Sequence, residues 1–265
     1  LPGPGNPCGY TTPVEVLMDE AGSGSDEGRA MAQLVHGVAP GARLLFSAAG
    51  SSELTMAQSI RRLAEAGADI IVDDITFPSQ TYFQRGIVST VVLGVREEYG
   101  LAYLTSAGNA NAAVMTDEGL TPLSSWQSDA YRPMACPEWL AQDEADPLLG
   151  ASDVDCLDFD PGAAELPYDT LRIQDDEEPA AMMPIASIGE PLFGVTTSYE
   201  LRFYEVDASD PDADPVLLDR VSSFGGGVYP GLMGSIEVDP GTELRMVMVR
   251  TAFDGSAPLP PVWLG

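Results

Sequence analysis

Lysine is absent from this sequence, and its positive charge comes from 12 arginines set against 41 aspartates and glutamates. The net charge of −29 at pH 7 repels a phosphate backbone and an anionic membrane surface. The sequence also lacks any run of 18 consecutive apolar residues, so it predicts no membrane-spanning helix. We therefore expect neither a nucleic acid nor a membrane as a partner.

Cysteine is scarce too, with only Cys8, Cys136 and Cys156. Their spacing matches no zinc-ligand pattern, and the single histidine supplies no cluster of imidazoles, so we expect no metal site built on them. In an oxidising compartment Cys136 and Cys156 would close a loop, while Cys8 would pair with a group outside this chain. The alternative is three buried thiols.

Residues 1–115 alternate between stretches typical of strands and stretches typical of helices. The predicted strands are Val14–Met18, Arg43–Ala48, Asp69–Asp74 and Leu101–Thr105, and the predicted helices cover about 26–37, 53–66 and 83–98. The strands are almost continuously apolar, which is typical of parallel strands that are covered on both faces. We therefore predict a three-layer αβα domain with a parallel sheet.

The rest of the chain has a different character. Residues 116–154 follow no clear period and are predicted to form an irregular connection. Residues 155–265 contain short alternating segments separated by turn signals such as G-G-G at 225–227 and D-P-G at 239–241. This spacing predicts an antiparallel β-sandwich.

Four segments of the first half carry recognisable motifs. They are D-E-G-R-A-M at 26–31, V-A-P-G-A at 38–42, A-D-I-I-V-D-D at 68–74 and the strand that ends in S-A-G-N at 106–109. Together these segments resemble subtilisin-like (S8/S53) serine peptidases. Their order and spacing agree with the family over about 85 residues. The second half also resembles a subgroup in which a β-sandwich interrupts the catalytic domain, through the strand-like run at 194–204.

The resemblance implies a secreted enzyme, monomeric and without a cofactor, that hydrolyses polypeptides through a serine acyl-enzyme. It places Glu27 where the family has its catalytic histidine, and it places the Asn109 amide in the oxyanion hole. Ligand chemistry in open α/β sheets gathers at the carboxyl ends of the strands. The predicted substrate-binding residues at those ends are Asp73, Asp74, Ser106 and Gly108.

The sequence also departs from the family. The G-T-S-x-A-x-P segment that carries the nucleophilic serine does not occur, and the family's aspartate strand would lie before Leu1. We therefore expect a fragment that is inactive by itself. The sedolisin branch holds its glutamate base with an aspartate four residues later, but this chain has Met31 there. Asp26, Asp73 and Asp74 are alternative partners for Glu27.

Each candidate has a plainer interpretation. Glu27 complements the dipole of its helix, and Asn109 hydrogen-bonds its own turn. His36 lies at the end of that helix, where a role at the terminal carbonyls is favoured over catalysis. A second class of function is therefore a non-catalytic module that binds protein or glycan.

One acidic cluster also raises the question of calcium. Its members are Asp207, Asp210, Asp212 and Asp214. Close-set carboxylates are suitable calcium ligands, but the cluster lacks the spacing and the glycine of an EF-hand. We therefore favour a solvated loop over a calcium site.

Overall fold

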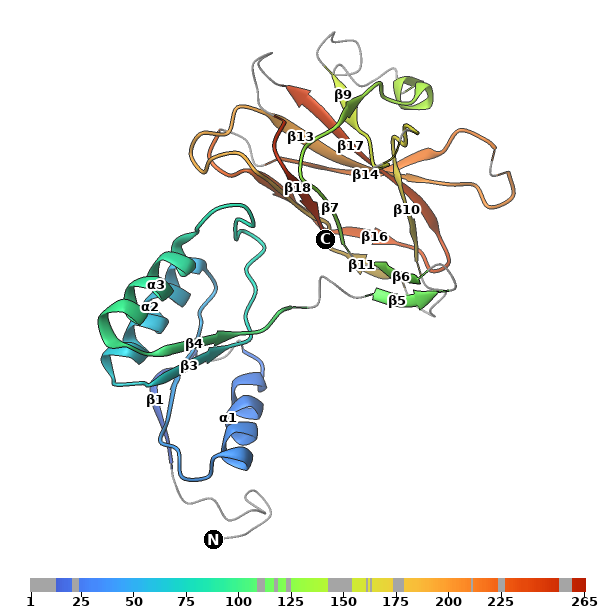
Figure 1. Cartoon of the computed structure of the whole chain (residues 1–265). Helices are drawn as coiled ribbons and strands as arrows, with labels where there is room; N and C mark the ends of the chain where they lie inside the picture. Colours follow the sequence, from blue (N-terminus) through green and yellow to red (C-terminus); the bar gives the residue numbers. More distant parts are fainter. Residues whose placement is uncertain are drawn as a thin grey trace. The chain divides into compact units, whose positions relative to one another are not determined.

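The computed structural model describes residues 13–20, 24–108, 113–116, 119–122, 125–142, 154–160, 162, 164–173, 179–210, 212–223, 227–252 and 259–265. The chain is mixed α/β, and most of its sheets are antiparallel (Figure 1). It divides into two compact units. The first comprises Leu1–Gln80 and Arg85–Gly108, and the second comprises Thr81–Gln84 and Asn109–Gly265.

The first unit follows the predicted alternation of strands and helices. Its elements are β1 (Val14–Met18), α1 (Glu27–Val38), β2 (Leu44–Ser47), α2 (Glu53–Glu65), β3 (Ile70–Asp73), α3 (Ile87–Tyr99) and β4 (Ala102–Thr105). Parallel pairing joins β1 to β2 and β3 to β4. Over the described residues these are two separate two-stranded sheets, rather than the single parallel sheet that the sequence predicts.

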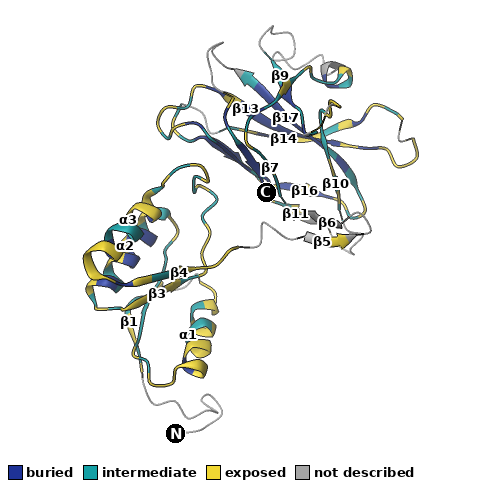
Figure 2. Ribbon diagram, in the orientation of Figure 1, coloured by how far each residue is buried: buried dark blue, intermediate teal, exposed yellow. Residues whose placement is uncertain are grey.

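Two helices build the core of the first unit. Helix α2 begins with a capping box in which Ser52 and Thr55 bond each other's backbone N–H groups, and α3 ends at Gly100, whose φ of 70° is readily adopted by glycine. Side chains of both helices pack with Ile71 and Leu101 in one apolar cluster. Figure 2 shows buried stretches in the ribbons of α2 and α3.

The other face of β3 and β4 is open. Ile70 is 60% exposed, Val72 48% and Leu104 57%. The prediction of a sheet covered on both faces is therefore wrong for this strand pair within the described residues. The physical reason is that, among the described residues, the core cluster of this strand pair takes its helical side chains from α2 and α3 alone, and these pack with Ile71 and Tyr103 rather than with Ile70, Val72 or Leu104.

The second unit, which we call the two-sheet unit, consists mainly of two antiparallel sheets. The first sheet has the order β14-β13-β17-β9-β8, and β10 also pairs with β17. Its strands are β8 (Pro133–Met134), β9 (Asp155–Leu157), β10 (Asp169–Arg172), β13 (Ser198–Glu205), β14 (Val216–Ser222) and β17 (Glu243–Ala252).

The second sheet of this unit has the order β15-β12-β18-β7. Its strands are β7 (Trp126–Ser128), β12 (Ile185–Ile188), β15 (Gly231–Met233) and β18 (Val262–Leu264). Two further antiparallel pairs are β5 (Ala113–Thr116) with β6 (Gly119–Pro122), and β11 (Ala180–Met182) with β16 (Ile236–Val238). Side chains of both large sheets, such as Phe203 and Leu264, pack into one apolar core. Shared burial of this kind is what holds two sheets face to face.

The stretch predicted to be irregular, residues 116–154, contributes to this unit. It supplies β7 to one sheet and β8 to the other, followed by a short 3₁₀ helix, η1 (Glu138–Gln142). The predicted disulfide between Cys136 and Cys156 is confirmed, with the two Cα atoms 4.9 Å apart. Cys8 lies outside the described residues. No helix in the described part of the chain has the length and apolar character needed to cross a membrane.

Candidate functional site

Three polar side chains meet where β3 and β4 end. Asp73 is the last residue of β3 and pairs in register with Thr105, the last residue of β4. The Asp73 carboxylate accepts hydrogen bonds from the Tyr103 hydroxyl and from Thr105 Oγ1, the latter over 2.8 Å. A third donor is the backbone N–H of Ile75, 3.4 Å from Asp73 Oδ1. Asp73 therefore ties the carboxyl ends of two parallel strands together.

This arrangement perturbs Tyr103. Burial, the hydrogen bond to Asp73 and the negative charge of Asp73 raise the pKa of the Tyr103 hydroxyl above its ordinary value of 10.0. The hydroxyl therefore stays protonated when an exposed tyrosine would begin to ionise, and it keeps donating to the carboxylate. In that form it is a fixed hydrogen-bond donor rather than a general base.

We expect this hydroxyl to make stability depend on alkaline pH. A tyrosine whose pKa is raised in the folded state contributes stability that is fully present below pH 10. This stability is lost progressively as the pH rises above the pKa of the tyrosine in the unfolded chain. Between pH 9 and 11, Tyr103→Phe should therefore lose less free energy of unfolding than the unmodified chain, as measured by urea denaturation. Thr105→Val is the control, because it removes a donor to Asp73 without removing an ionisable group. Equal pH slopes for Tyr103→Phe and the unmodified chain would contradict the assignment.

Other predicted cleft residues follow the same strands. Asp74 comes directly after β3 and is exposed, and Ser106 comes directly after β4 and is exposed. The Ser106 N–H donates to the Asp73 carbonyl oxygen over 3.3 Å. Gly108 has a φ of 69°, and a Cβ there would meet no atom within 4 Å. Asn109, the predicted oxyanion donor, lies outside the described residues.

Glu27 stands apart from this group. It is the first residue of α1, its side chain is exposed, and its N–H lies 3.4 Å from Ser25 Oγ. Its neighbour Asp26 forms an ion pair with Arg29 over 3.0 Å. Among the described residues, no hydrogen bond joins the Glu27 side chain to Asp73 or Asp74. The structure therefore leaves the choice among the predicted partners of Glu27 open.

The single histidine of the chain lies at the C-terminal end of the same helix. His36 is buried in the last turn of α1, nine residues from Glu27. This is the helix-end position that the sequence favoured over a catalytic one.

One carboxylate of the acidic cluster considered for calcium, that of Asp207, is held by hydrogen bonds within its own loop. Asp207 accepts hydrogen bonds from the N–H and the hydroxyl of Ser209, over 2.8 and 2.6 Å. These bonds lower the pKa of Asp207 by stabilising its carboxylate. Within the described parts of the chain, no three histidine, cysteine or acidic side chains are grouped closely enough to hold a metal ion.

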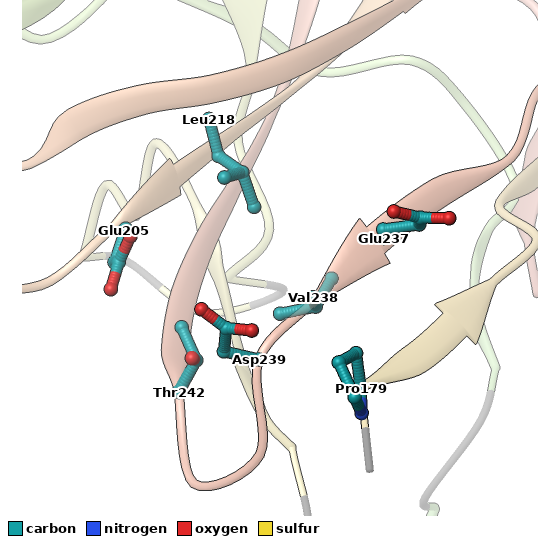
Figure 3. A pocket seen from close by; sticks show the side chains of 7 residues that line it. All are labelled: Pro179, Glu205, Leu218, Glu237, Val238, Asp239 and Thr242. Carbon is teal, nitrogen blue, oxygen red and sulfur yellow. The ribbon is translucent and has the colours of Figure 1, made fainter.

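The two-sheet unit has a small hollow on its surface that no sequence motif predicted. The hollow has a volume of about 240 Å³, and its carboxylates come from Glu205, Glu237 and Asp239 (Figure 3). These residues belong to β13, to β16 and to the turn after β16, so only the folded sheets bring them together. No periodic pattern in the sequence could have found this grouping. Three carboxylates with no basic residue in the lining disfavour an anionic ligand.

A comparison of this chain with protein-family models finds no match. A comparison with curated proteins finds none either. The function of this chain is therefore inferred from the motifs of its sequence and from the geometry of the strand ends.

Proposed function

We propose that this chain is part of a subtilisin-like serine endopeptidase. Its first unit would supply the middle of the catalytic core, and its two-sheet unit would be a β-sandwich inserted into that core. One observation carries the proposal: within the family-like motifs, Asp73, Asp74 and Ser106 lie at the carboxyl ends of two adjacent parallel strands, β3 and β4. That is where ligand chemistry gathers in α/β sheets.

The proposed roles follow from the family resemblance and, for the described residues, from their position and exposure. Glu27 acts as the general base at the start of α1, where its carboxylate is open to a reacting group. Asn109 donates its amide to the developing oxyanion. Asp74, Ser106 and Gly108 border the polypeptide substrate. Asp73 accepts hydrogen bonds from three donors of its own unit, which fix the strand ends and hold its carboxylate at the border of the substrate site.

Two further observations support the proposal. The open face of β3 and β4 carries exposed apolar side chains, and α1 exposes Leu34 and Val38 in the same unit. Parallel strands are normally buried on both faces, so this unit is suited to being covered by more of a catalytic domain. The Cys136–Cys156 disulfide fits the oxidising environment of a secreted enzyme.

The alternative is a non-catalytic module that binds protein or glycan and descends from such a peptidase. The observation that favours it is the exposed Glu27 carboxylate, for which the described residues provide no second carboxylate in hydrogen-bond contact. A glutamate base in a peptidase is normally supported by such a partner, because a neighbouring carboxylate makes it more basic.

A serine-directed fluorophosphonate distinguishes these functions. An acyl-enzyme needs a nucleophile placed against a base and an oxyanion donor. We expect a longer protein that contains this chain to be labelled at one serine, and residues 1–265 alone to stay unlabelled. Mass spectrometry of tryptic peptides identifies the labelled residue. Stoichiometric labelling of a serine within residues 1–265 would contradict the proposed site, and no labelling of the longer protein would favour the binding module.

A further inference from the structure

A four-residue segment of the α/β half belongs to the two-sheet unit. Residues 81–84 lie in sequence between β3 and α3, yet their contacts group them with residues 109–265. The contacts involve an aromatic ring, a backbone amide and a side-chain amide.

Tyr82 makes the aromatic contact. Its ring stacks on the ring of Trp263, with centroids 4.0 Å apart and the planes 16° from parallel. Its backbone N–H lies 3.3 Å from the hydroxyl oxygen of Ser187, which is buried in β12. Trp263 lies in β18, an interior strand of the sheet β15-β12-β18-β7, and it is buried, so Tyr82 stacks on a side chain that this sheet holds.

Gln84 makes the polar contact. Its Nε2 donates to the carbonyl oxygen of Glu190 over 2.7 Å, and its Oε1 accepts from the N–H of Leu192 over 2.9 Å. One primary amide thus satisfies a backbone acceptor and a backbone donor two residues apart. A glutamate of the same length keeps the acceptor and loses the donor.

The turn that receives Gln84 is held by its own unit. The buried Glu190 carboxylate accepts hydrogen bonds from the hydroxyls of Thr196 and Thr197, over 3.1 and 2.7 Å. The N–H of Gly189 donates to the Pro261 carbonyl over 2.8 Å, and a Cβ at this glycine would overlap the Pro261 ring. The turn is therefore held by contacts that do not involve the segment.

From these contacts we propose that the turn Gly189–Leu192, together with Ser187 and Trp263, forms a recognition site for a Tyr-x-Gln segment. The site is occupied in cis by Tyr82–Gln84. Its consequence is that the connection between β3 and α3 is ordered by the two-sheet unit rather than by the helix that follows. This inference goes beyond the proposed function and does not require that the protein be a peptidase.

The test is Gln84→Glu in the full 265-residue chain. Under limited digestion, trypsin should cleave the variant faster after Arg85, an exposed residue that directly follows the segment. Losing a hydrogen bond and placing a carboxylate against a carbonyl oxygen should raise this cleavage rate by roughly 10- to 100-fold. Amide exchange at Leu192 should rise by a similar factor, because its acceptor is released more often.

Gln58→Glu is the matched control, since it makes the same charge change at an exposed position of α2. It should leave cleavage at Arg85 unchanged. Equal cleavage and equal Leu192 exchange in Gln84→Glu and the unmodified chain would overturn the proposal. Unfolding of the two-sheet unit in Gln84→Glu would overturn it as well, because a preformed site does not need its occupant in order to fold.

Discussion

Glu27→Gln, introduced into the longer peptidase that we propose, is expected to slow peptide hydrolysis by about 10²- to 10⁴-fold, the range typical of a lost general base. Glutamine has nearly the same shape as glutamate but cannot take up the proton of the nucleophilic serine. The folding cost should be small, because Glu27 is exposed and its stabilising contribution is that of an acid at a helix start, about 0.3–1 kcal/mol. The measurement is kcat/KM on a peptide substrate, with thermal unfolding as the check on folding.

Two control variants separate catalysis from helix stability. Glu53→Gln removes the acid from the first turn of α2, which has the same relation to its helix dipole, and it should leave hydrolysis nearly unchanged. His36→Ala should also retain most of the activity. His36 lies about 13 Å from Glu27 along the helix axis at 1.5 Å per residue, too far to share one proton. A Glu27→Gln enzyme that keeps its rate would exclude Glu27 as the base.

The pH profile provides an independent reading of the same assignment. A carboxylate base is ionised at lower pH than an imidazole, so activity should extend to more acidic pH than in relatives that use histidine. Inactivity of the unmutated longer protein at every pH would favour the non-catalytic binding module.

The helices of the first unit were predictable because their signals are local. The apolar spacing and the residues that end each helix predicted 53–66, and the structure has α2 at Glu53–Glu65. The start of α3 was predicted at residue 83, but the helix begins at Ile87. The reason is tertiary contacts. Tyr82 and Gln84 contact side chains and backbone of the two-sheet unit, so residues 83–86 do not become helical although their apolar spacing predicts a helix.

Pairing between distant segments was harder to predict. Strands β7 and β8 have three and two residues, too few to display an alternating pattern, so the region around them was predicted to be irregular. The candidate site shows the same limit. Asp73 was found by its place after an apolar strand, whereas Tyr103 lies inside the next strand and has no motif of its own. Its role depends on the register of β3 with β4, which no local pattern encodes.

The largest effect on stability is expected for the disulfide. Replacing both Cys136 and Cys156 with alanine should lower the free energy of unfolding of the two-sheet unit by ~3 kcal/mol on the chain-entropy model, for a sequence separation of 20 residues. Cys156 is fully buried in β9, where it pairs with Val249 of β17. The bond therefore joins the connection before η1 to an interior strand of the sheet.

Tryptophan fluorescence isolates this effect, because all three tryptophans of the chain, Trp126, Trp139 and Trp263, belong to the two-sheet unit. Urea titration of the double variant should show a lower midpoint. A reducing agent should shift the unmodified chain toward the same midpoint and leave the variant unchanged, which separates loss of the bond from the cost of the substitution. Peptide mapping without reduction should recover Cys136 linked to Cys156. Recovery of Cys8 in a bond with either of them, or a variant with an unchanged midpoint and slope, would contradict the prediction, because a cross-link that constrains the unfolded chain must change its stability when it is removed.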